Sequence, residues 1–135
     1  MTEPTYIISF WLRKILVPID GSENSLRALE LAIDFAMRYG SQISIIHVCE
    51  ECNENEIRSL IEKRVNGRIN YDLKFLKYSN KESSVTNEIL KFLSENTYDA
   101  VILGARGLSI TSDINIGSVA LSVAVNAPTT VIIVR

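Results

Sequence analysis

The fold is decided by the stretch Lys14-Ile15-Leu16-Val17-Pro18-Ile19-Asp20-Gly21. This stretch is an almost continuous apolar run that stops at an acidic residue followed by a glycine. Continuous apolar character, rather than alternation of apolar and polar residues, is typical of a strand that is covered on both faces, as in parallel sheets. The run therefore predicts the first strand of an α/β domain.

Strands and helices alternate along the rest of the chain. Further strands are predicted at residues 42–48, 69–77, 99–103 and 129–134. Helices are predicted from Ser22 to Gly40, over 53–66, after Ser83 or Ser84, and over 117–126, from serine caps and from apolar residues at helical spacing. Alternation at this period favours right-handed crossovers and one parallel sheet with helices on both faces.

Composition narrows the class of protein. The 135 residues suit a single domain, and the formal net charge of −2, without a block of like charge, argues against a nucleic-acid binder. The apolar segment at residues 6–12 is far shorter than the ~20 residues of a membrane span and lacks signal-peptide flanks. Two cysteines do not make a disulfide framework. We therefore expect a soluble, cytoplasmic domain with no membrane partner.

Ligands of an open parallel sheet bind beyond the carboxyl ends of its strands. This rule selects the loops after Ile19, after Val48 and after Leu103. The last of these loops carries Gly104 and Gly107, and Gly117-Ser118 follows at the start of a predicted helix. Glycines let a backbone approach a ligand closely, and a helix N-terminus favours an anion. The sequence therefore predicts an anion-binding loop, with turn glycines of positive φ as the alternative.

Three well-known site motifs do not occur in the chain. There is no G-x-x-x-x-G-K-[ST] phosphate loop, no G-x-G-x-x-G after the first strand and no G-x-S-x-G elbow. The single histidine, His47, lies inside the second predicted strand, so a hydrolase triad lacks its base. These absences exclude the commonest nucleotidase, dinucleotide and hydrolase sites.

The chain resembles the universal stress protein family, and specifically its ATP-binding branch. The resemblance covers residues 14–135 and rests on Val17 to Ser22, on His47-Val48, and on the pattern G-x2-G-x9-G-[ST] that begins at Gly104. It implies a Rossmann-like, adenine nucleotide alpha hydrolase-like domain with strand order 3-2-1-4-5, preceded by an N-terminal extension over residues 1–13. It also implies dimerisation through the last strand, residues 129–134.

The resemblance further implies a set of site residues for an adenine nucleotide. Asp20 corresponds to the residue that binds the ribose, Pro18 and Ile19 lie near the base, and the backbone of Val48 reads adenine. The phosphates are held by Gly104, Arg106, Gly107, Gly117, Ser118 and Val119. The implied ligand is ATP, with ADP or AMP as substitutes, and Mg²⁺ or Mn²⁺ accompanies the triphosphate.

Each of these residues also has a structural interpretation. Asp20 could instead stabilise the turn at Gly21 or cap the first helix. Arg106 could be a solvated surface arginine, and Asp113 is a solvated loop carboxylate or a ligand of a phosphate-bound metal ion. Cys49 and Cys52 are too few for a zinc site, and a redox function stays open. Phe10 and Trp11 suit a packing anchor or a dimer contact.

Three hypotheses about function follow from these observations. The first is a nucleotide-binding regulatory protein of the stress response, in which any ATP hydrolysis is slow because no lysine or base is placed near the phosphates. The second is a protein-interaction module with a vestigial nucleotide site. The third is an enzyme, either a slow nucleotidase or a redox protein built on Cys49 and Cys52.

Overall fold

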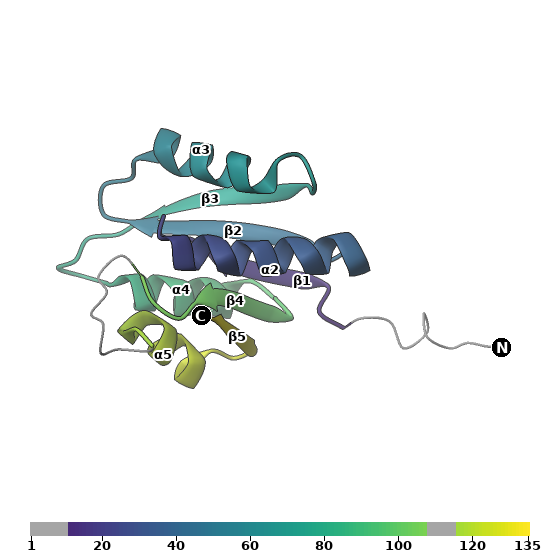
Figure 1. Ribbon diagram of the computed structural model, residues 1–135. Helices are drawn as coiled ribbons and strands as arrows, with labels where there is room; N and C mark the ends of the chain where they lie inside the picture. Colours follow the sequence, from purple (N-terminus) through teal and green to yellow (C-terminus); the bar gives the residue numbers. More distant parts are fainter. Residues whose placement is uncertain (1–10, 108–115) are drawn as a thin grey trace.

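The computed structural model describes residues 11–107 and 116–135, and Figure 1 shows how their helices and strands are arranged. Strands and helices alternate in the order β1 (Lys14–Pro18), α2 (Glu23–Tyr39), β2 (Gln42–Cys49), α3 (Glu54–Val65), β3 (Tyr71–Lys77), α4 (Val85–Glu95), β4 (Ala100–Gly104), α5 (Ser118–Asn126) and β5 (Thr130–Val134). Each predicted strand and helix is present, and the bounds differ by only a few residues.

The five strands form one parallel sheet in the order β3-β2-β1-β4-β5, which confirms the predicted fold class and strand order. The order reverses at β1, which pairs with β2 on one side and with β4 on the other. The connections that follow β1 and β4 therefore lead to helices on opposite faces of the sheet. In an open α/β sheet, a crevice forms between the carboxyl ends of two such strands.

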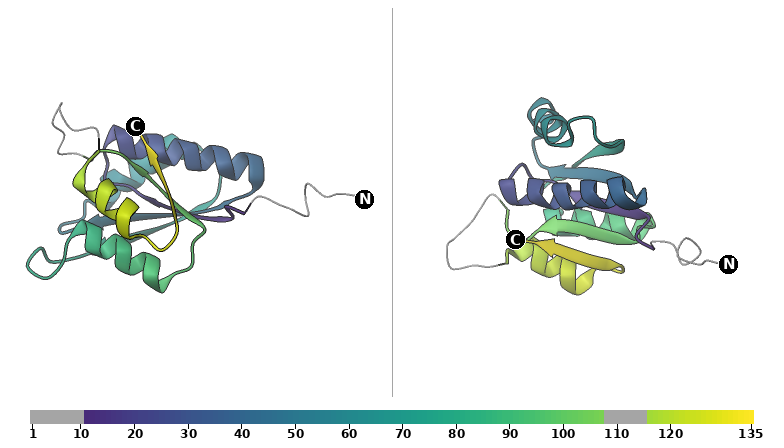
Figure 2. Two further views of the ribbon diagram at one scale, coloured as in Figure 1. Left: turned by 90° about the horizontal axis from the view of Figure 1, so that it is seen from below. Right: turned by 45° about the vertical axis from the view of Figure 1, so that its right-hand side comes forward.

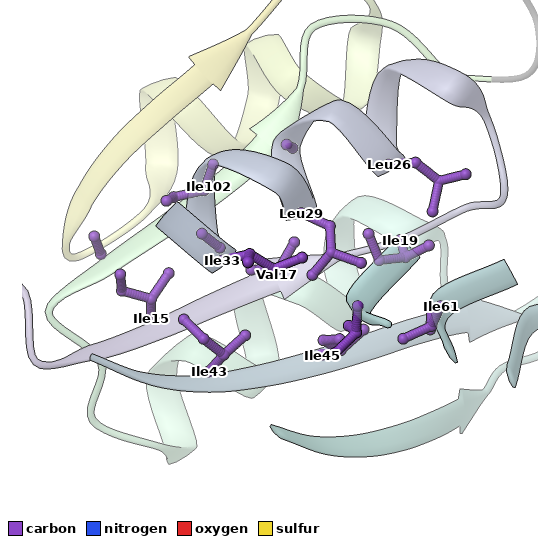
Figure 3. Close-up of a cluster of buried hydrophobic side chains, with 14 of the residues drawn as sticks. Ile15, Val17, Ile19, Leu26, Leu29, Ile33, Ile43, Ile45, Ile61 and Ile102 are labelled. Atoms are coloured by element: carbon purple, nitrogen blue, oxygen red, sulfur yellow. The ribbon is translucent and has the colours of Figure 1, made fainter. Parts of the chain in front are cut away.

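Helices cover both faces of the sheet (Figure 2, left). Successive side chains of β1 point to opposite faces. Ile15 and Val17 point into a core that is closed by α2 and α3, whereas Leu16 points into a second core closed by α4 and α5. Figure 3 shows the first core, where Leu29 and Ile33 of α2 lie against Val17. Burial on both faces explains why the deciding stretch is apolar without alternation.

The ends of α2 follow from local chemistry. The Ser22 side chain accepts a hydrogen bond from the Ser25 amide, as an N-cap should, and Gly40 ends the helix in the left-handed conformation at φ 75°. Both residues were expected at these positions. The cap fixes where α2 begins, and so fixes the turn that leads out of β1.

The sheet edge at β3 differs from the centre. Burial alternates from Tyr71 to Phe75 in β3, and this strand begins at Tyr71 rather than at residue 69. Alternation is typical of a strand with one face less covered than the other, which agrees with its place at the edge of the sheet.

Part of the predicted N-terminal extension is described. Leu12 is buried in the first core and its carbonyl accepts a hydrogen bond from the Ser41 hydroxyl at 2.7 Å, while Trp11 is 60% exposed. Leu12, rather than Trp11, is therefore a packing anchor; Phe10 lies outside the described residues. Along residues 11–107 and 116–135, no helix has the length and apolar character that crossing a bilayer requires.

Candidate functional site

A cavity of about 450 Å³ opens at the carboxyl ends of β1 and β4, at the point where the strand order reverses. All ten residues that the sequence predicted for a nucleotide site line it: Pro18, Ile19, Asp20, Val48, Gly104, Arg106, Gly107, Gly117, Ser118 and Val119. Residues from four loops or strand ends thus meet in one hollow, whose volume lies in the range of small-molecule pockets.

Asp20 has one carboxylate oxygen committed to the fold and the other directed at the glycine loop. Its Oδ1 accepts a hydrogen bond of 2.8 Å from the Ser22 amide, which is the turn-stabilising role foreseen as an alternative. Its Oδ2 lies beside Gly107, where a Cβ atom would approach it to 2.6 Å. The structural and the binding interpretation are therefore compatible, because each uses a different oxygen.

The glycines of the loop are needed for space and not for positive φ. Positive φ among described glycines occurs at Gly21, Gly40 and Gly67, so the turn-glycine alternative is wrong for the cavity. A side chain at position 107 would displace the Asp20 carboxylate. One at position 117 would come within 3.3 Å of the Ala105 carbonyl oxygen. Neighbouring atoms therefore leave little room for a side chain at either position.

Gly104 has a role that the sequence did not reveal. A Cβ atom at this position would lie 2.9 Å from the backbone carbonyl of Asn24 in the first turn of α2. The Asn24 side chain also accepts a 2.7 Å hydrogen bond from the Arg106 amide, which holds the loop after β4 against α2. Gly104 lines the cavity, but its missing side chain makes room for α2 rather than for a ligand.

The start of α5 faces the cavity without a side-chain cap. Its N-cap is Gly117, whose amide donates to the Ala105 carbonyl at 2.6 Å, and among the described residues no side chain caps the helix. By contrast Ser22, Asn53 and Ser84 cap the other described helices with their side chains. Ser118 and the first amides of α5 can therefore bind an anion in the cavity.

Part of the cavity wall is apolar, and two residues of that part were not among the predicted site residues. Val85 and Ile89 of α4 line the cavity together with Val48 and Leu103. Their helical spacing of four residues puts Val85 and Ile89 on one face of α4. That spacing was visible in the sequence, but only the packing of α4 against the sheet shows that this face reaches the cavity.

His47 lies within β2, as predicted, and it also forms part of the cavity wall, which was not predicted. It is buried, its ring packs edge-on against Phe75, and its Nδ1 lies 2.7 Å from the Ile19 carbonyl oxygen. Because a carbonyl only accepts, Nδ1 carries the proton. The imidazole thereby ties the end of β2 to the turn that carries Asp20.

The site offers little for metal binding through the protein itself. No group of three or more His, Cys, Asp or Glu side chains suited to a metal ion exists in the described residues, and Asp20 is the one carboxylate among the described cavity residues. Asp113, the other carboxylate considered, lies outside the described residues. A divalent ion would therefore depend on a ligand's own phosphates for most of its coordination.

Cys49 and Cys52 are joined by a disulfide bond, with their Cα atoms 5.3 Å apart. The bond links the last residue of β2 to the residue before Asn53, which caps α3. The sequence left the role of this pair open.

Comparisons with known proteins agree with this architecture. Residues 12–135 match the model of the universal stress protein family. The chain is 29% identical to the universal stress protein YxiE of Bacillus subtilis, covering 90% of this chain and 98% of YxiE.

Two solved structures share the fold. One is a universal stress protein in complex with cAMP, with a TM-score of 0.72 and 22% identity over 91% of this chain and 96% of the other. The second is the universal stress protein from Archaeoglobus fulgidus in complex with dAMP, with a TM-score of 0.68 and 19% identity over 93% of this chain and 100% of the other. On the family match over residues 12–135, the chain belongs to the universal stress protein family.

Proposed function

We propose that this universal stress protein binds an adenine nucleotide, with ATP as its physiological ligand, in the cavity between β1 and β4. The observation that carries the proposal is the lining of that cavity, which combines the apolar side chains of Val48, Val85 and Ile89 with the start of α5 at Gly117 and Ser118. A purine fits the first environment and phosphates fit the second. The cAMP and dAMP complexes of two proteins with this fold support the choice of adenine.

The proposal assigns a contact to each part of the nucleotide. Asp20 Oδ2 accepts hydrogen bonds from the ribose hydroxyls, while Oδ1 keeps the turn in place. The bare backbone at Gly107 and Gly117 lets the phosphates approach, and the Ser118 hydroxyl and the amides of α5 donate to them. Mg²⁺ or Mn²⁺ accompanies the phosphates and is held mainly by them.

We further propose that binding, rather than turnover, is the activity. Among the described cavity residues, no lysine is present to stabilise charge on a γ-phosphate, and Asp20 is occupied by the turn on one side. Any hydrolysis is therefore slow, and a bound nucleotide acts as a signal for regulation in the stress response.

Calorimetric titration of the purified protein with ATP–Mg²⁺ tests the proposal, with GTP–Mg²⁺ as the base control. We expect micromolar ATP binding, corresponding to about −8 kcal/mol, and much weaker GTP binding. At 100 times its dissociation constant, ATP should raise the free energy of unfolding by about 2.7 kcal/mol.

Ser118→Ala and Ser122→Ala form a matched pair, because the two serines lie one turn apart on α5. Ser118→Ala should weaken ATP binding by about fivefold, the value of one hydrogen bond, while Ser122→Ala leaves it unchanged. Gly117→Val should abolish binding by filling the approach to the phosphates. If no adenine nucleotide binds or shifts the melting temperature, the interaction-module hypothesis replaces this one.

A further inference from the structure

The disulfide between Cys49 and Cys52 lies outside the nucleotide cavity, and its two sulfurs are unequally accessible. Cys49 is 8% exposed and faces the interior, whereas Cys52 is partly exposed at the turn into α3. Exchange with an external thiol needs a direct approach to one sulfur. The burial pattern therefore makes Cys52 the sulfur that an external thiol can reach.

A shallow hollow of about 530 Å³ surrounds Cys52 and is lined by residues 51–55. Glu51 and Glu54 flank the cysteine in this hollow, and Glu50 and Glu56 are exposed close by. Arg58 lies 3.7 Å from Glu54, and Lys77 is the residue paired with Cys49 on the neighbouring strand. Within residues 50–56 the charged side chains are four glutamates, with no lysine or arginine, which leaves the approach to Cys52 acidic.

The backbone around Cys49 is held independently of the disulfide. Cys49 pairs with Lys77 in the parallel ladder, and its carbonyl accepts a 3.1 Å hydrogen bond from the Tyr78 amide. The cap of α3 is likewise supplied by Asn53 and not by either cysteine. Opening the bridge would therefore free the turn at residues 50–52 and leave β2 and α3 in place, so the pair can be reduced and re-formed in the folded protein.

We propose that Cys49 and Cys52 form a thiol–disulfide exchange site, with Cys52 as the exchanging sulfur, Cys49 as the resolving sulfur, and neutral or cationic thiols as substrates. The thiolate of a substrate attacks Cys52 Sγ, a mixed disulfide forms, and the bond to Cys49 breaks. The electron pair leaves on Cys49 Sγ, which takes a proton from water.

A second substrate thiolate then attacks the substrate sulfur of the mixed disulfide and releases the Cys52 thiolate, which takes a proton. Two substrate thiols have become one disulfide, and the protein disulfide has become two thiols. The reduced Cys49 thiol has carbonyl acceptors in His47 and Leu76, whose oxygens lie 3.8 Å and 3.9 Å from its sulfur. These acceptors give the buried thiol partners in the reduced state, which keeps this state compatible with the fold.

The first test compares single-cysteine variants. Cys49→Ser leaves Cys52 and Cys52→Ser leaves Cys49, and intact mass spectrometry follows the mixed disulfide formed with cystamine, a dicationic disulfide. The variant that retains Cys52 should react at least about tenfold faster, because its sulfur is accessible. Far-UV circular dichroism checks that both variants are folded. Equal rates in folded variants would overturn the proposal.

The second test uses the unchanged protein, so it does not depend on the folding of a variant. Cysteamine, 2-mercaptoethanol and glutathione are cationic, neutral and anionic thiols, and each is applied at the same thiolate concentration in native buffer. Cysteamine should open the bridge severalfold faster than glutathione, and peptide mapping should find the trapped mixed disulfide on Cys52. The preference should shrink at high salt and in Glu51→Gln/Glu54→Gln.

A bridge that resists all three thiols until the protein is denatured would be a closed structural link, and the exchange site would be rejected. If glutathione reacts faster than cysteamine, the proposed preference for neutral or cationic thiols is wrong. If the isolated protein carries free thiols, cystamine should oxidise them to the bridge, and failure to do so would also overturn the proposal. These measurements contain no nucleotide, so they succeed or fail independently of ATP binding.

Discussion

At the residue scale, Asp20 performs two tasks with two oxygens, and substitution can separate them. Asparagine retains an oxygen that accepts from the Ser22 amide, so Asp20→Asn should change the free energy of unfolding by less than about 0.5 kcal/mol. It loses the charge offered to the ribose, and ATP affinity should fall about tenfold. Asp20→Ala should lose both the affinity and about 1 kcal/mol of stability. Calorimetry and urea unfolding measure the two quantities, and equal stabilities of the two variants would contradict the turn role.

Gly107 allows a second prediction at this scale. A methyl group at position 107 would lie 2.6 Å from Asp20 Oδ2, so Gly107→Ala should displace the carboxylate and weaken ATP binding by about tenfold. The φ of this residue is not positive, so the variant needs no strained backbone. Ser122→Ala is the control, because Ser122 lies on α5 and is not among the residues that line the cavity. An unchanged ATP affinity of Gly107→Ala would show that the position of the Asp20 carboxylate does not matter for ATP binding.

At the scale of elements, the approach of β4 to α2 depends on Gly104. A methyl group there would meet the Asn24 backbone at 2.9 Å, and helix backbone cannot move aside as a flexible side chain can. Gly104→Ala should therefore destabilise the protein by about 1–3 kcal/mol, the usual effect of overpacking, as measured by urea unfolding. A variant as stable as the parent protein would show that α2 shifts without penalty.

The contact between α2 and the turn after α3 should depend on pH. Arg68 donates to both oxygens of Glu30, and this hydrogen bonding lowers the pKa of the Glu30 carboxyl. A lowered pKa stabilises the folded state at neutral pH, and the contribution is lost as pH falls through that pKa. Glu30→Gln should cost about 0.5 kcal/mol at pH 7, since both side chains are about a third exposed or more, and less at pH 3. Urea unfolding at both pH values checks this, and an undiminished difference at pH 3 would contradict it.

At the scale of the whole molecule, β5 is an edge strand, and we propose that two copies of the chain pair through it. Two apolar side chains of α5, the helix that precedes β5, are exposed: Leu121 and Val125. The Val134 carbonyl accepts from the Ala105 amide, so the alternation of strand groups directs the Ile133 amide to the free edge. Ile133→Pro should therefore remove an edge donor and shift a dimer to monomers. Light scattering across a dilution series measures this, and an unchanged mass would exclude pairing at β5.

The sequence predicts the order of helices and strands better than it predicts which residues form the cavity wall and why. Helical spacing, capping residues and apolar strand runs are local signals, so the element order and the sheet class follow from them. The walls supplied by His47, Val85 and Ile89 depend on which faces meet across the sheet, and Gly104 depends on its distance from Asn24. Such long-range contacts leave no trace in local spacing.

The cavity is lined partly by backbone and partly by side chains, and this affects how the ligand preference of related proteins can change. Close neighbours keep the backbone at Gly107 and Gly117 without side chains, whereas α4 contributes the aliphatic side chains of Val85 and Ile89 to the wall. Replacing Val85 or Ile89 would change the apolar part of the wall and leave the two glycines as they are. Under the proposed function, substitutions on α4 can therefore alter the preference for a base without altering the glycines of the loop.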